Sequence, residues 1–112
     1  MEAWMDYLAR QAEAGRTEAA ALAAEGRQDD ANFVKVRANI YDVCKTVSRA
    51  LLNRPGAGAG AVRERLERFR NEWGEALRKA RDHGDVRGIA VEETKLAALA
   101  DVLAHFPEVT AP

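Results

Sequence analysis

The residues of this sequence best suited to catalysis are one cysteine, two histidines and a few hydroxyl side chains. Cys44 lies among Ile40, Val43 and Val47, so we expect a small buried side chain rather than a nucleophile. Ser48 and the threonines have no histidine at a spacing that would activate a hydroxyl for nucleophilic attack. We therefore expect that the protein is not an enzyme.

The sequence also predicts neither a metal site nor a cofactor site. A zinc ion needs three or four converging ligands, whereas His83 and His105 lie far apart and only one cysteine accompanies them. Asp101 and His105 are four residues apart on one helix face, a spacing that more often gives a surface pair than a metal site. The glycines between 56 and 60 follow a helix and lack the lysine of a phosphate-binding loop.

Arg37 is a candidate for anion binding. It is predicted to project between Val34 and Ile40 onto the apolar face of its helix. A buried charge is unfavourable unless it is paired, so we predict that Arg37 meets a carboxylate, with Glu93 as the first choice. The alternative interpretation is an anion-binding pocket around Arg37.

A row of arginines on the third predicted helix is a second candidate for anion or phosphate contact. Arg63, Arg70 and Arg81 share one face, which Glu67 interrupts. A solvated face crossed by ion pairs between neighbouring turns is the more usual meaning of such a row. The 17 Lys and Arg residues are balanced by 18 Asp and Glu, and the net charge of -1 disfavours a nucleic-acid clamp.

Helices must position all of these residues, because strong helix formers fill the sequence and no alternation typical of strands appears. Gly26 and Gly84 are expected to end the first and third helices. Asp29 or Asp30 is expected to cap the second helix, and Asp85 the fourth. The predicted helices cover 2–25, 30–52, 61–83 and 85–106.

The helices predict an all-α fold, an antiparallel up-and-down four-helix bundle made of two helical hairpins. A Gly/Ala-rich linker over 53–60 joins the hairpins, and the tail at 107–112 is expected to fray. With 112 residues, the chain is expected to form a single domain over 1–112. Near Gly15 and Ala19 the first helix presents small residues, so we expect a neighbouring backbone to approach closely there.

The fourth predicted helix carries two apolar rows. One row is expected to face the core and consists of Val86, Ile89, Leu96, Ala100 and Leu103. The opposite row consists of Val91, Ala98 and Val102, and a second apolar row often marks an interface. Because the core is short of large residues, we predict self-association as a homodimer through this row. Another protein is the other possible partner.

Two segments resemble small uncharacterised bacterial proteins that are all helical. They are the stretch 29–43, from Asp29-Asp30-Ala31-Asn32-Phe33 to Tyr41-Asp42-Val43, and the opening Trp4-Met5-Asp6-Tyr7-Leu8. The resemblance covers about half of the chain. It implies a bacterial source and a helical fold, and it assigns no functional residue.

These observations favour a non-catalytic, self-associating protein-interaction or scaffold module. A nucleic-acid-associated or small-anion-binding regulatory protein is the alternative. The single cysteine fits a reducing compartment, and the opening residues lack the blocks of a signal peptide, so we expect a cytoplasmic location. No apolar run approaches the roughly 18 residues of a membrane helix, so no membrane partner is expected.

Overall fold

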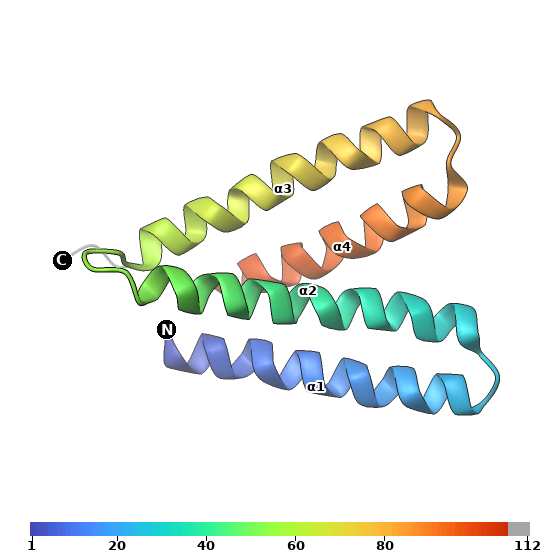
Figure 1. Ribbon diagram of the computed structural model, residues 1–112, viewed down its shortest axis with the longest axis horizontal. Helices are drawn as coiled ribbons and strands as arrows, with labels where there is room; N and C mark the ends of the chain where they lie inside the picture. Colours follow the sequence, from blue (N-terminus) through green and yellow to red (C-terminus); the bar gives the residue numbers. More distant parts are fainter. Residues whose placement is uncertain (108–112) are drawn as a thin grey trace.

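The computed structural model describes residues 1–107, which form four α-helices (Figure 1). These are α1 (Glu2–Ala24), α2 (Gln28–Leu52), α3 (Ala59–Asp82) and α4 (Val86–Ala104). The all-α, four-helix prediction is confirmed, and each helix begins and ends within about two residues of its predicted bounds. α3 begins inside the predicted 53–60 linker. Apart from Pro107, the predicted frayed tail lies outside the described residues.

Glycines in the left-handed region close the two tight turns, as predicted. Gly26 has φ +78° and Gly84 has φ +62°, a backbone conformation that is unfavourable for residues with a Cβ atom. Asp85 caps α4, and its carboxylate accepts a backbone N–H from the first turn of that helix. The prediction that Asp29 or Asp30 caps α2 is wrong, because α2 begins before both residues. Their carboxylates instead lie in the first turn, where the helix dipole favours negative charge.

Small side chains let α1 and α2 pack closely. A Cβ atom added to Gly15 would lie 2.7 Å from the Cβ of Ala38, so only a hydrogen atom fits at this contact. Ala12, Ala19 and Ala31 are other fully or nearly fully buried alanines of this pair. The predicted close approach near Gly15 and Ala19 is therefore confirmed.

The two hairpins meet at one end of the molecule and diverge at the other (Figure 1). The molecule measures 50 × 34 × 21 Å, and its radius of gyration is 15.4 Å. A compact chain of this length has a radius of gyration of about 13 Å, so the arrangement is open. The buried core comes from the first halves of α1 and α3 and the second halves of α2 and α4, which together form the joined end. Its larger members are Trp4, Leu8, Ile40, Tyr41, Val62, Leu66, Phe69, Leu99, Val102 and Phe106.

The inward face of α4 differs from the prediction. Val86 is 79% exposed and Ala100 is exposed, whereas Ala98 and Val102 are 2% and 0% exposed. Apolar residues surround most of α4, so periodicity alone does not select the face that packs inward. Tertiary contacts select it: the indole Nε1 of Trp4 donates a hydrogen bond to the carbonyl oxygen of Val102 at 3.1 Å.

Candidate interaction groove

An apolar groove of about 400 Å³ lies between the first halves of α2 and α4, at the open end of the molecule. We call it the α2–α4 groove. It exists because the hairpins diverge beyond the core, which leaves both helix flanks partly uncovered. Its lining residues are Asp29, Asn32, Phe33 and Val36 from α2, and Val86, Arg87, Ala90 and Val91 from α4.

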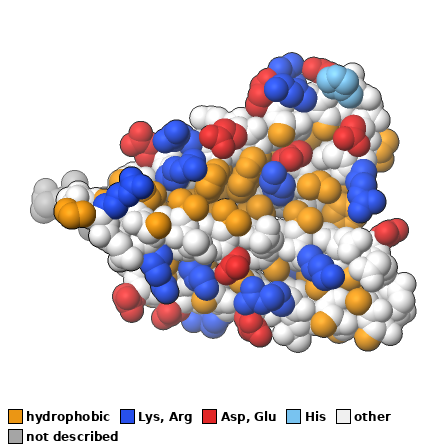
Figure 2. Space-filling view, in the orientation of Figure 1, with side chains coloured by type: hydrophobic (Ala, Val, Ile, Leu, Met, Phe, Trp, Pro, Cys, Tyr) orange, Lys and Arg blue, Asp and Glu red, His pale blue; other side chains and the backbone are white. Residues whose placement is uncertain are grey.

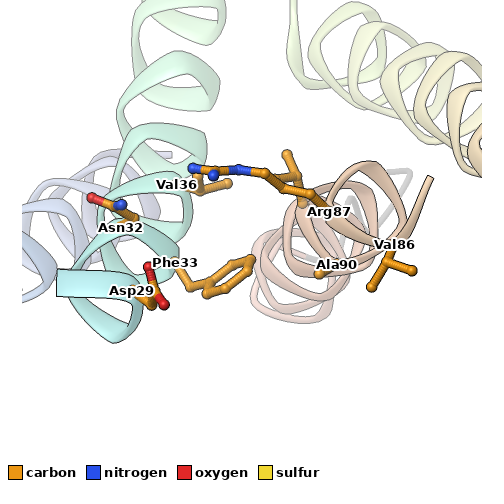
Figure 3. Close-up of a pocket in the computed structure, with 8 residues that line it drawn as sticks. Asp29, Asn32, Phe33, Val36, Val86, Arg87 and Ala90 are labelled. Atoms are coloured by element: carbon orange, nitrogen blue, oxygen red, sulfur yellow. The ribbon is translucent and has the colours of Figure 1, made fainter. Parts of the chain in front are cut away.

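Apolar side chains form most of the groove. The ring of Phe33 points from α2 across the groove toward Ala90 of α4, and Val86 stands at the outer end of α4 (Figure 3). A shallower hollow continues along α4 past Phe33 as far as Ala97. On the face shown in Figure 2, hydrophobic side chains gather between the two hairpins, with charged side chains on either side. The open end therefore presents an apolar surface with a charged rim.

Each wall of the groove contributes one charged residue, Asp29 from α2 and Arg87 from α4. The guanidinium of Arg87 reaches from α4 over Val36 toward Asn32, while Asp29 lies next to the base of the Phe33 side chain on α2 (Figure 3). Among residues 1–107, neither Arg87 nor Asp29 forms an ion pair. Both charges are thus available to a molecule that enters the groove.

The predicted interface row belongs to this groove only in part. Val91 lines the groove and is half-buried, but Ala98 and Val102 are core residues. The prediction of an interface through Ala98 and Val102 is therefore wrong. Phe33 and Val36 belong to the broad apolar face of α2. In the structure, the neighbour on the α4 side diverges from them.

Arg37 is not buried, contrary to the prediction. Its Nη2 lies 2.8 Å from Oε2 of Glu18, and 47% of its side chain is exposed. A carboxylate partner is confirmed, but the choice of Glu93 is wrong, since Glu93 faces Arg81 at 3.8 Å. The anion-pocket interpretation loses its basis, because an exposed, paired arginine encloses no pocket.

The three arginines of α3 each face a carboxylate. Arg63 Nη2 lies 3.9 Å from Oε1 of Glu67, and Arg70 pairs with the same glutamate. Arg81 pairs with Glu93 of α4. The row is therefore a solvated face crossed by ion pairs, the more usual of the two readings of its sequence pattern.

A polar cluster at the joined end holds three helices together. The hydroxyl groups of Tyr7 and Tyr41 both donate hydrogen bonds to Oδ2 of Asp101, at 2.7 and 2.5 Å. The ring of His105 stacks on that of Tyr7 with 4.2 Å between centroids, and its Nδ1 lies 3.3 Å from Oδ1 of Asp101. This Asp101 cluster joins α1, α2 and α4, and the predicted pairing of Asp101 with His105 is part of it.

Hydrogen bonding sets the protonation of the Asp101 cluster. Burial opposes ionisation of Asp101, but the hydrogen bonds from Tyr41 and Tyr7, together with the electrostatic influence of His105 and Arg37, outweigh it and lower the pKa of the carboxyl. Burial, together with the hydrogen bonds to Asp101, raises the pKa of Tyr7 to about 12 and raises that of Tyr41 as well. At neutral pH the carboxylate is ionised and both phenols are protonated, which keeps both hydrogen bonds from the tyrosines to Asp101 in place.

Cys44 is fully buried in α2, as predicted. Burial raises the pKa of its thiol to about 12, so the sulfur stays protonated at neutral pH. A protonated and enclosed thiol is a poor nucleophile. Cys44 thus packs as a small apolar side chain.

Three findings concern the chain more widely. Across residues 1–107, no group of three or more His, Cys, Asp or Glu side chains is placed to hold a metal ion. None of the helices in that range is long and apolar enough to cross a membrane. No protein-family model, curated protein or solved structure matches the chain.

Proposed function

We propose that this protein is a non-catalytic interaction module that associates with a second copy of itself through the α2–α4 groove. The observation that carries the proposal is the apolar lining left uncovered at the open end, with Phe33 and Val36 half-buried and Val86 79% exposed. Apolar patches of this kind are typical of protein interaction sites. Covering them removes apolar area from water, at a gain of about 25 cal/mol per Å².

The position of the core supports the proposal. The fully buried large side chains lie at the joined end, and they include Leu8, Leu66 and Leu99. The open end therefore gains little burial from its own chain. A small domain buries a smaller fraction of its surface than a large one, so association is an effective source of further burial.

Light scattering after gel filtration, at two protein concentrations, tests self-association. We expect a mass of two chains at the higher concentration. Val86→Glu and Val91→Glu are expected to give the mass of one chain, because each places a carboxylate in the apolar contact. A wild-type mass of one chain at both concentrations contradicts the proposal.

Thr46→Glu is the matched control. Thr46 is a β-branched, exposed residue of α2 that lies outside the groove, so its replacement adds the same charge elsewhere. This variant is expected to keep the wild-type mass. Circular dichroism should show that all three variants retain wild-type helix content, since Val86 and Thr46 are exposed and Val91 is only half-buried. A dimeric Val86→Glu or Val91→Glu variant contradicts the groove as the contact surface.

The alternative of nucleic-acid association draws no support from the geometry, because Arg63, Arg70 and Arg81 each face a carboxylate. We expect no retention on a heparin column at low salt, where phosphate-binding proteins bind most tightly. Retention that falls steeply with salt would favour this alternative.

We further propose a cytoplasmic location in a bacterial cell. The lone thiol of Cys44 and the resemblance of 29–43 and Trp4–Leu8 to bacterial helical proteins support it. Fractionation of the native cells with an antibody against the chain tests the location. Recovery from the membrane or the medium would contradict it.

A further inference from the structure

We infer that the second copy docks through a two-fold axis that places Arg87 of each chain against Asp29 of the other. The inference rests on the proposed self-association and specifies how the two grooves meet. Each dimer would then contain this ion pair twice. The apolar lining would lie between the two pairs.

A two-fold interface is made of the same surface on both chains, so that surface must carry both members of every complementary pair. The α2–α4 groove meets this requirement for charge, because its α2 wall carries Asp29 and its α4 wall carries Arg87. It also meets the requirement for shape. Val86 protrudes from the α4 wall with 79% of its surface exposed, while the hollow beside Phe33 is open to receive an apolar side chain.

Within residues 1–107, two acidic side chains beside Asp29 and Arg87 are already engaged. Asp30, next to Asp29, pairs with Arg27 at 3.0 Å, and Asp85 accepts a hydrogen bond from the backbone of α4. Arg87 and Asp29 form no ion pair within residues 1–107, although they face the same groove. A reciprocal contact would neutralise both.

The flexible side chain of Arg87 suits this arrangement. Its guanidinium lies over Val36 within its own chain (Figure 3). Rotation about its side-chain bonds toward a partner would uncover Val36 for apolar contact at the same moment. An unrelated helical partner would need an apolar face and two opposite charges at matching positions, but a second copy supplies all of these by symmetry.

Charge-reversal variants test the pairing. In a two-fold dimer of Asp29→Arg, two arginines meet at each contact, and in a dimer of Arg87→Asp two aspartates meet. Each variant alone is therefore expected to dimerise about ten-fold or more weakly than the wild type. In a one-to-one mixture, both contacts of the heterodimer again join opposite charges, so we expect affinity to return to near the wild-type value.

This design separates contacts between chains from contacts within one chain. Neither variant contains both an aspartate and an arginine at these two positions, so rescue on mixing cannot come from an internal ion pair. Asp6→Arg and Arg10→Asp form the matched control, because they make the same charge changes at exposed positions of α1 outside the groove. Each control is expected to dimerise like the wild type, and mixing them should add nothing.

The outcomes distinguish the pairing from the proposed function. If Asp29→Arg and Arg87→Asp dimerise normally, or if mixing fails to rescue them, the two-fold pairing is overturned. Self-association through the groove would still stand if Val86→Glu were monomeric. A monomeric wild type would overturn both.

Discussion

The two hairpins bury their surfaces in different ways. In the α1–α2 hairpin, Gly15 meets Ala38 so closely that a Cβ would lie 2.7 Å from the neighbouring Cβ. In the α3–α4 hairpin, a Cβ added to Gly74 would meet nothing within 4 Å. Large side chains bridge the helices there, and the ammonium of Lys95 lies 4.8 Å from the ring centroid of Trp73. In the first hairpin the contact between the helices is made by closely approaching backbones, whereas in the second it is made by long side chains.

This difference places stability and binding at opposite ends of the molecule. In the α1–α2 hairpin the two helices pack closely. The α3–α4 hairpin packs against this pair at the joined end, through the shared core and the Asp101 cluster. Beyond the joined end the hairpins diverge, and the α2–α4 groove lies between them. Four substitutions test this difference between the two ends of the molecule.

The largest effect on stability is expected at the joined end, from Leu99→Ala. Leu99 is fully buried in the core shared by the two hairpins, so its truncation removes apolar burial and leaves a cavity. We expect the free energy of unfolding to fall by about 2–5 kcal/mol in a urea titration. Leu99→Met nearly conserves volume and should cost less than about 1.5 kcal/mol. Equal losses for both variants would show that cavity formation is not the cause.

Next in size is Gly15→Val, which tests the close packing of the first hairpin. Its side chain would collide with Ala38, so α1 and α2 would have to separate. We expect a loss of about 1–3 kcal/mol in the free energy of unfolding, measured by thermal or urea denaturation. An unchanged stability would mean that the two helices tolerate a wider spacing.

A smaller, pH-dependent effect is expected from Asp101→Asn. The lowered pKa of Asp101 in the folded state means that its ionised form stabilises the fold above about pH 4, and this contribution is lost as the pH falls through the folded pKa. Because 36% of the side chain is exposed, we expect a difference of only about 1 kcal/mol from the wild type at pH 7. Urea titrations at pH 7 and pH 3 should show this difference shrinking. A difference that is equal at both pH values would contradict the role of the charge.

The smallest effect is a gain, from Gly74→Ala in the second hairpin. Gly74 lies inside α3 with open space around its Cβ position, so alanine fits and lowers the entropy of the unfolded chain. We expect the free energy of unfolding to rise by about 0.5–1 kcal/mol in the same titration. A loss of stability would contradict the open space around the Cβ position of Gly74.

Local sequence patterns were sufficient for the helices and for several contacts. Gly26 and Gly84 mark the tight turns because glycine adopts a positive φ without steric strain, and the small residues around Gly15 predicted the close approach of α2. Asp101 and His105 were paired from their spacing on one helix turn, and Cys44 was expected to be buried from its apolar neighbours. These features depend on residues close together in sequence or on the size of one side chain.

The tertiary structure alone decided which face of α4 packs inward, which carboxylate Arg37 meets, and that a groove exists. Apolar residues almost encircle α4, so burial of Val102 rather than Val86 depends on the distant Trp4 and on the Asp101 cluster. The long side chain of Arg37 reaches Glu18 in solvent, an outcome that no local period specifies. The groove depends on the angle at which the two hairpins meet, and that angle is set by how side chains of both hairpins pack in their shared core at the joined end.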